Sequence, residues 1–189
     1  MTMFQVRLHG RGGQGVVTAA EMLSIAAFLE GRHAQAFPNF GSERMGAPVV
    51  SFCRIDDKPI RLREPIHEPD AVIVQDVTLL GAVPVFQGLK PKGYVLVNST
   101  KTLKELGLAD ALNKMPEGHV RVVGATELAV RHVGRPVPNA ALLGAFAGVT
   151  GLLHFASVEA AIRDKFKGAV GDGNVKAARA AFDDVAVPA

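Results

Sequence analysis

The chain has 189 residues, a formal net charge of +3 and hydrophobic residues at 48% of its positions. This length supports one domain with a sizeable core and is short for two domains of ordinary size. The positive excess is small and scattered, and aromatic residues make up only 6% of the chain, which argues against a basic nucleic-acid-binding face and against a base-stacking platform.

The N-terminal part of the chain predicts a strand, a glycine-rich turn and a helix. Residues 4–8 alternate apolar with polar side chains, and Arg7 and His9 belong to the polar set, so we expect a strand with one wetter face. The run GRGGQG follows at 10–15, and residues 16–29 favour a helix. Because few polar residues interrupt this helix, we expect it to be buried between the sheet and a partner.

The middle of the chain predicts most of the sheet. Residues 35–48 show little regular pattern and are expected to form a loop. Residues 48–55 favour a strand, and 60–63 could return as a short antiparallel strand, which would make the sheet mixed. Three further apolar runs are flanked by turn residues and predict central parallel strands, at 71–75, 94–98 and 120–123.

The C-terminal third predicts helices. Thr126, Asn139, Ser157 and Asn174 are candidate N-caps, and we expect residues 171–173 to form a flexible break. The helices are expected at 126–133, 140–153, 158–166 and from 174 to 185. With no internal repeat or linker, the chain predicts one domain over 1–189: an α/β three-layer sandwich with a mixed, mostly parallel, Rossmann-like sheet.

Cysteine use and hydropathy bound the cellular setting. The single cysteine, Cys53, cannot form an internal disulfide or hold an iron–sulfur cluster, which normally takes four thiolates. Cys53 lies in a β-rich run and is interpreted as a small core residue. The sequence shows no signal-peptide pattern and no apolar run of membrane-spanning length. We therefore expect a cytoplasmic protein without a membrane partner.

The glycine-rich turn has two interpretations. Its pattern G-x-G-x-x-G, between a strand and a helix, could bring backbone N–H groups to an anion, or it could be a tight turn with no ligand. A dinucleotide site also requires an acidic residue about 20 positions later, at the end of a second strand. The acidic residues nearby, Glu30 and Glu43, do not follow a β-rich run. Asp76 and Asn98 end apolar strands and could contact a ligand or cap a helix.

The loop over 36–48 is the most unusual stretch, with two Pro, two Gly and two Phe. Long irregular loops in compact domains are usually functional or disordered, and the aromatic residues argue against disorder. We therefore expect the loop to pack against this domain or a neighbour. The adjacent Glu43 and Arg44 could each bind a separate partner, or both could be solvated.

Three blocks together resemble the gamma subunit of the 2-oxoacid:ferredoxin oxidoreductases, the family of pyruvate:ferredoxin oxidoreductase. They read HGRGGQG at 9–15, AQAFP at 34–38 and GSERMGAPV at 41–49. The stretch NAALLGAFAG at 139–148 is similar to a later motif of that family. The resemblance covers nearly the whole chain, and its combination of blocks is more specific than any single block.

The resemblance implies a hetero-oligomeric oxidoreductase. Such a holoenzyme decarboxylates a 2-oxoacid, such as pyruvate, on thiamine diphosphate, passes electrons through [4Fe-4S] clusters to ferredoxin or another acceptor, and transfers the acyl group to coenzyme A. Thiamine diphosphate and the clusters would belong to alpha-, beta- and delta-type partner subunits, in agreement with the single cysteine here. The gamma chain would be inactive alone and would contribute to assembly and to the active-site and coenzyme A region.

The resemblance also suggests where this chain contacts cofactors. We expect such contacts from Gly12, Gly13, Gln14, Gly15, Asn39, Glu43 and Arg44. We expect Arg44 to face the subunit interface beside the thiamine site, and we expect neither a catalytic residue nor a metal ligand. Two alternatives remain: a stand-alone nucleotide-binding α/β protein that uses the GRGGQG turn, and a purely structural subunit.

Overall fold

The computed structural model describes residues 2–39 and 44–186. In this part of the chain six strands form one sheet in the order β2-β3-β1-β4-β5-β6. The strands are β1 (Phe4–Arg11), β2 (His33–Pro38), β3 (Pro48–Asp56), β4 (Ala71–Val74), β5 (Tyr94–Asn98) and β6 (Val120–Val123). The helices are α1 (Val16–Leu29), the 3-10 helix η1 (Val77–Gly81), α2 (Ala125–Val133), α3 (Asn139–Thr150), α4 (Phe155–Lys165) and α5 (Gly168–Val185).

The sheet is mixed, as predicted, but for a different reason. β1, β4, β5 and β6 are parallel neighbours, whereas β3 pairs antiparallel with both β1 and β2. Residues 60–63, predicted as a return strand, form no strand. Residues 33–38, partly assigned to the irregular loop, form β2, because β3 offers them a ladder from Ser51 to Asp56. The α/β fold with a mostly parallel sheet is confirmed.

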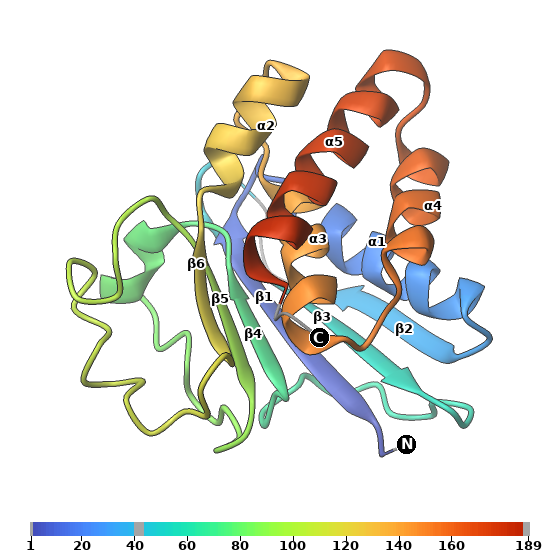
Figure 1. The fold of residues 1–189 in the computed structure, drawn as a ribbon. Coiled ribbons are helices and arrows are strands. Elements are labelled where there is room, and N and C mark those ends of the chain that lie inside the picture. Colours follow the sequence, from blue (N-terminus) through green and yellow to red (C-terminus); the bar gives the residue numbers. More distant parts are fainter. Residues whose placement is uncertain (1, 40–43, 187–189) are drawn as a thin grey trace.

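The α-helices cover one face of the sheet, which we call the helical face (Figure 1). Its core combines side chains from alternate strand positions with the helices, and includes Val6, Leu8, Cys53, Ile55 and Ile73. α3 and α5 approach so closely that a Cβ atom at Gly144 would collide with the backbone carbonyl of Ala178. Small residues therefore determine the spacing within this layer.

The predicted helix boundaries needed correction near their N-termini. Residues 171–173, predicted as a flexible break, lie inside α5, where Gly173 lets the helix pack against the His132 carbonyl. The four candidate caps are residues of the helices themselves: Thr126, Asn139, Ser157 and Asn174. The residues that precede α4 and α5, His154 and Lys167, have extended backbones, whereas Pro138 before α3 is already in the helical region.

The opposite face, which we call the turn-rich face, is covered by η1 and by irregular segments at 82–93 and 99–118 (Figure 1). A second apolar cluster fills the space beneath them, with Val72, Val74, Leu79, Val95 and Val97 at its centre. The sheet therefore lies between two layers, as expected for a three-layer sandwich, although turns build most of the second layer.

The polar side of β1 is buried, which corrects the prediction of a wetter face. Arg7 and His9 are only 8% and 6% exposed. They are covered because Ile66, Val85 and Gln87 lie over them and accept hydrogen bonds from Arg7. Burial of a central strand therefore does not require apolar residues on both sides when a covering backbone supplies acceptors.

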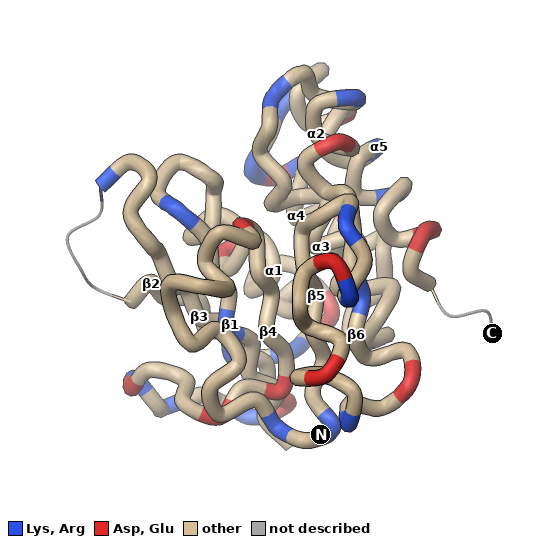
Figure 2. Tube along the Cα trace, turned by 90° about the vertical axis from the view of Figure 1, so that its left-hand side faces the viewer, with Lys and Arg blue, Asp and Glu red and all other residues tan. Residues whose placement is uncertain are grey.

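Charged residues of both signs are intermixed along the traced parts of the chain (Figure 2). Several form surface pairs, such as Lys165 with Glu21 and Arg163 with Asp172. Within 2–39 and 44–186, no helix is long and apolar enough to cross a bilayer.

Candidate functional site

The glycine-rich turn lies at the carboxyl end of β1, next to the carboxyl end of β4. Gln14 joins the two: its Oε1 accepts a hydrogen bond from the Arg11 backbone N–H at 2.8 Å, and its Nε2 donates to Asp76 Oδ2 at 2.8 Å. The buried Gln75 donates from its side chain to the Gln14 carbonyl at 2.9 Å. Ligands in open α/β sheets commonly bind at this edge. We call the group Arg11, Gln14, Asp76 and Asn98 the carboxyl-edge site.

Arg11 holds three separate segments together at this site. Its Nε donates to Thr78 Oγ1 at 3.0 Å in η1, and its Nη1 donates to the Gly46 carbonyl at 2.9 Å. The same guanidinium lies 3.5 Å from Asp76 Oδ2. The Arg11 side chain therefore fixes the 44–48 segment and η1 relative to the glycine-rich turn.

Asp76 is an ionised anchor at the end of β4. Burial alone would raise the pKa of this carboxyl, but hydrogen bonds from Thr78 and Gln14 and the charge of Arg11 outweigh it and lower the pKa. Thr78 donates to Asp76 from both its backbone N–H and its hydroxyl. The Asp76 carboxylate therefore stabilises the site through these hydrogen bonds. It also caps η1, which confirms the helix-cap interpretation of this residue.

Backbone geometry explains the glycines of the turn. Gly13 and Gly15 have positive φ angles of 92° and 71°, which favour glycine. A Cβ atom at Gly12 would collide with the backbone carbonyl of Arg44. Gly12 also exchanges hydrogen bonds with the 44–48 segment, donating to the Ala47 carbonyl at 2.9 Å and accepting from the Gly46 N–H at 3.1 Å. The turn and the 44–48 segment are therefore one structural unit.

Two cavities adjoin this unit. One, of about 250 Å³, lies over the start of α1. The N-cap residue of this helix is Gly15, which has no side chain to cap the first N–H groups. The other, of about 310 Å³, is polar and lies between the ends of β4 and β5. Asn98 spans its floor, donating to the Gln75 carbonyl and to Thr126 Oγ1 at 2.8 Å each. Amide N–H groups, hydroxyls and a helix N-terminus are suited to binding a polar or anionic group.

The structure brings some of the predicted site residues together and separates others. Gly12, Gly13, Gln14 and Gly15 form the turn, and Arg44 is exposed directly beside Gly12. Asn39 instead lies on the turn-rich face, at the wall of a different cavity. Glu43 lies outside the described residues.

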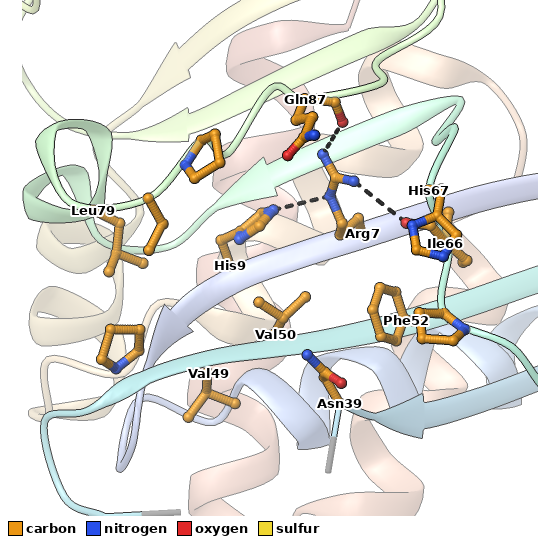
Figure 3. Close-up of a pocket in the computed structure, with 14 residues that line it drawn as sticks. Arg7, His9, Asn39, Val49, Val50, Phe52, Ile66, His67, Leu79 and Gln87 are labelled. Carbon is orange, nitrogen blue, oxygen red and sulfur yellow. Dashed lines mark hydrogen bonds between the residues drawn. The ribbon is translucent and has the colours of Figure 1, made fainter. Parts of the chain in front are cut away.

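A cluster that the sequence reasoning missed lines that third cavity, of about 270 Å³ (Figure 3). Arg7 Nε donates to His9 Nε2 at 3.1 Å. Burial, followed by the charge of Arg7, lowers the pKa of His9 to about 4, although the Val85 carbonyl acts in the opposite direction. The sequence signal for this cluster was the presence of two ionisable residues on one central strand. Because they alternate with apolar residues, they were expected on a solvent-facing side of the strand.

Neither a reactive thiol nor a metal centre stands out in the described part of the chain. Cys53 is fully buried, and burial raises the pKa of its thiol. Within the same residues, no three His, Cys, Asp or Glu side chains are grouped to hold a metal ion.

Comparisons with known proteins cover nearly the whole chain. A family model for pyruvate ferredoxin/flavodoxin oxidoreductase matches residues 5–183. The chain is 51% identical to the common gamma subunit of the pyruvate/ketoisovalerate oxidoreductases of Pyrococcus furiosus, over 98% of each chain. It is 50% identical to pyruvate synthase subunit PorC of Methanocaldococcus jannaschii, over 97% of each chain.

A solved structure agrees with both. The crystal structure of the PORC subunit of pyruvate oxidoreductase from Thermotoga maritima superposes with a TM-score of 0.81 at 35% identity and covers 97% of each chain. Sequence and fold therefore match over nearly the same extent of the chain. The chain belongs to the pyruvate ferredoxin/flavodoxin oxidoreductase family.

Proposed function

We propose that this chain is the gamma subunit of a multi-subunit 2-oxoacid oxidoreductase, which oxidatively decarboxylates a 2-oxoacid to an acyl-coenzyme A and reduces ferredoxin or another acceptor. The end-to-end match to gamma subunits at about half identity carries this proposal. The complex would act in the cytoplasm.

The chemistry would be divided among the subunits. With one cysteine in the whole chain, this subunit cannot supply the thiolates of a [4Fe-4S] cluster. Within 2–39 and 44–186, no three His, Cys, Asp or Glu side chains are grouped as metal ligands. Thiamine diphosphate and the clusters would therefore be held by alpha-, beta- and delta-type partners, and this chain alone would have no activity.

The contribution of this chain would be to position coenzyme A and to complete the active-site region. Coenzyme A accepts the acyl group in such a holoenzyme, and its phosphates suit the N–H groups at the start of α1 and the exposed Arg44. The glycine-rich turn would hold Arg44 at the subunit interface because Gly12 contacts that residue's carbonyl. The proposal also includes Asn39, which lies at the wall of the cavity beside Arg7, and Glu43, which lies outside the described residues.

A partner would also cover the exposed apolar end of α1. Phe28 and Leu29 are 72% and 53% exposed at the end of an otherwise buried helix. Side chains of this size and exposure are suited to a subunit interface. The alternative, a stand-alone nucleotide-binding protein, has no comparable support. β2 pairs antiparallel with β3 at the sheet edge, whereas the second strand of a dinucleotide-binding fold lies parallel beside the first.

Substitution of the turn tests the proposed role of the glycine unit. Gly12→Ala would push the 44–48 segment away, and Gly13→Ala would add about 1 kcal/mol of backbone strain. We expect both to lower complex yield and turnover in steady-state 2-oxoacid oxidation by the reconstituted complex. Gly81→Ala is the control, because open space surrounds Gly81. Unchanged yield and turnover in both turn variants would contradict this role.

Arg44 gives a sharper test because it is exposed in the isolated chain. Arg44→Lys keeps the charge and loses the planar fork, so turnover should fall roughly 10- to 100-fold, as expected for a lost charge-assisted bond of about 1.5–3 kcal/mol. The thermal stability of the isolated chain should stay unchanged. Wild-type kinetics for both Arg44→Lys and Arg44→Ala would show that the residue is only solvated.

The isolated chain should have no iron–sulfur absorption band. Such a band would contradict the proposal that partner subunits hold the clusters.

A further inference from the structure

The cavity beside Arg7 and His9 lies on the turn-rich face, away from the helix N-terminus of the carboxyl-edge site. Figure 3 shows Arg7 and His9 on β1 and Val50 and Phe52 on β3 around this cavity, with Ile66 and Leu79 from the covering segments. At about 270 Å³ it is slightly smaller than most ligand pockets, which begin at roughly 300 Å³. It has room for a small molecule and not for a dinucleotide or coenzyme A.

The charge of Arg7 is not neutralised by any carboxylate in the described parts of the chain. Its guanidinium donates to three backbone carbonyls, of Ile66, Val85 and Gln87, and to the His9 ring, all of them neutral. Nη1 makes one of these bonds and carries two N–H groups, so one donor is left over. A cation that is only 8% exposed and has no counter-ion among the described residues is unusual, because burying an unpaired charge is costly.

His9 adds a second unmet donor at the same cavity. Because Arg7 Nε donates to His9 Nε2, the neutral imidazole must carry its proton on Nδ1. Nδ1 is buried and has no well-formed hydrogen bond with the residues that the structure describes, although the Val85 carbonyl lies near enough to raise the pKa of His9. Among the described residues, the polar end of the cavity therefore has two donors without a well-formed hydrogen bond and no carboxylate to balance the charge of Arg7.

Most of the remaining lining of the cavity is apolar, although His67 and Gln87 are polar. Phe52, Ile66, Leu79 and Val83 line it, and Asn39 stands exposed at its edge. A ligand that fits must therefore combine an anionic acceptor at one end with a short hydrocarbon body. Inorganic phosphate would satisfy the first requirement and leave the apolar wall unused.

We infer that this cavity binds a small monocarboxylate with a short hydrocarbon tail, whose carboxylate neutralises Arg7 beside His9 and whose tail packs against Phe52 and Ile66. The site goes beyond the proposed function, since it uses neither the glycine-rich turn nor any partner subunit. β1 would then contribute residues to two sites: Arg7 and His9 to the monocarboxylate site, and Arg11 at its end to the carboxyl-edge site.

The test uses the isotope-labelled full chain and two probes of the same shape. 3-Methylbutanoate is ionised at neutral pH, whereas 3-methylbutanamide is uncharged. We expect the acid to shift the resonances of His9, Phe52 and Ile66 in a saturable way, and its methyl groups to show nuclear Overhauser contacts to Phe52 and Ile66. The amide should bind at least about tenfold more weakly. Failure of the proposed function would leave this result untouched, because neither partners nor turnover are measured.

A matched pair of variants assigns the charge. Arg7→Lys should weaken binding of 3-methylbutanoate by about tenfold, whereas Arg54→Lys should leave it unchanged, because the buried Arg54 lies on the same sheet face and does not line the cavity. If Arg7→Lys fails to fold, the nuclear Overhauser contacts of 3-methylbutanoate to Phe52 and Ile66 in the wild-type chain test the inference. Absence of saturable shifts up to about 10 mM acid, equal affinity for the amide, or contacts to α1 instead of Phe52 would each overturn the inference.

Discussion

The two faces of the sheet are covered by different means. On the helical face, backbone hydrogen bonds are satisfied inside the helices, so alanines and glycines can pack closely, as where Gly144 meets Ala178. On the turn-rich face, the covering segments are irregular, and some of their backbone carbonyl groups have no backbone N–H partner. Two buried arginines on the sheet, Arg7 and Arg54, donate to those carbonyls.

Buried arginine side chains can therefore fix a covering layer to a sheet where that layer has little regular secondary structure. Arg54 is 1% exposed and donates to the Glu64 carbonyl at 2.6 Å, to Gln5 Oε1 at 3.0 Å and to Gln35 Oε1 at 3.3 Å. Its guanidinium also stands 5.3 Å from the centre of the Phe37 ring. A layer held in this way should respond to charge and pH, whereas the helical layer should respond to volume.

The largest effect should come from added volume on the helical face. Gly144→Ala puts a methyl group against the Ala178 carbonyl and should lower the free energy of unfolding by about 3 kcal/mol or more. Gly81→Ala, the same substitution on the turn-rich face, has open space and should change it by less than about 0.5 kcal/mol. Urea denaturation of both variants compares the faces directly, and equal losses would break the distinction.

The pH response should come from the turn-rich face. His9 has a folded pKa of about 4 against an ordinary value of 6.5. The unfolded chain therefore binds more protons between these values, and stability present above pH 6.5 is lost as the pH falls toward 4, by up to about 3 kcal/mol. His9→Gln should flatten this part of the stability profile. Asp76 does not interfere, because its lowered pKa places its own loss at still lower pH. An unchanged profile in His9→Gln would contradict this assignment.

A smaller and more local effect is expected at Arg54. Arg54→Met removes the charge and three hydrogen bonds while keeping apolar contact with Phe37, and should lower the free energy of unfolding by about 2 kcal/mol. Hydrogen exchange should quicken in the covering segment around Glu64 and stay slow in α3 and α5. Uniformly faster exchange would mean that Arg54 stabilises the whole sheet instead of one layer.

The sequence predicted most of the sheet because its strands are short apolar runs between turn residues. The parallel strands β4, β5 and β6 were found within one residue of their observed bounds. β2 was missed because its residues, from His33 to Pro38, are neither strongly apolar nor strictly alternating, and only the neighbouring β3 makes them a strand. Helix caps were misplaced because Asn139 and Asn174 use their side chains for contacts inside the helical layer.

The site was predictable only in part for a similar reason. Gly12 and Gly13 were identified because positive φ angles and close approaches leave a glycine signature that needs no partner. The junction of the turn with 44–48 depends on the antiparallel placement of β3 beside β1, which spacing along the chain does not reveal. The Arg7 and His9 cluster depends on segments about 60 to 80 residues away, whose coverage a local pattern cannot report.

The central position of β1 determines the order in which the molecule can be completed during synthesis. β1 leaves the ribosome before either of its partner strands, so its antiparallel ladder waits for residues 48–55 and its parallel ladder for residues 71–74. Such non-local pairing slows folding, because long loops must close before their contacts form. Until then the strand that will form the middle of the sheet is an unprotected edge on the nascent chain. Early association with chaperones or partner subunits would therefore matter most for the first 75 residues.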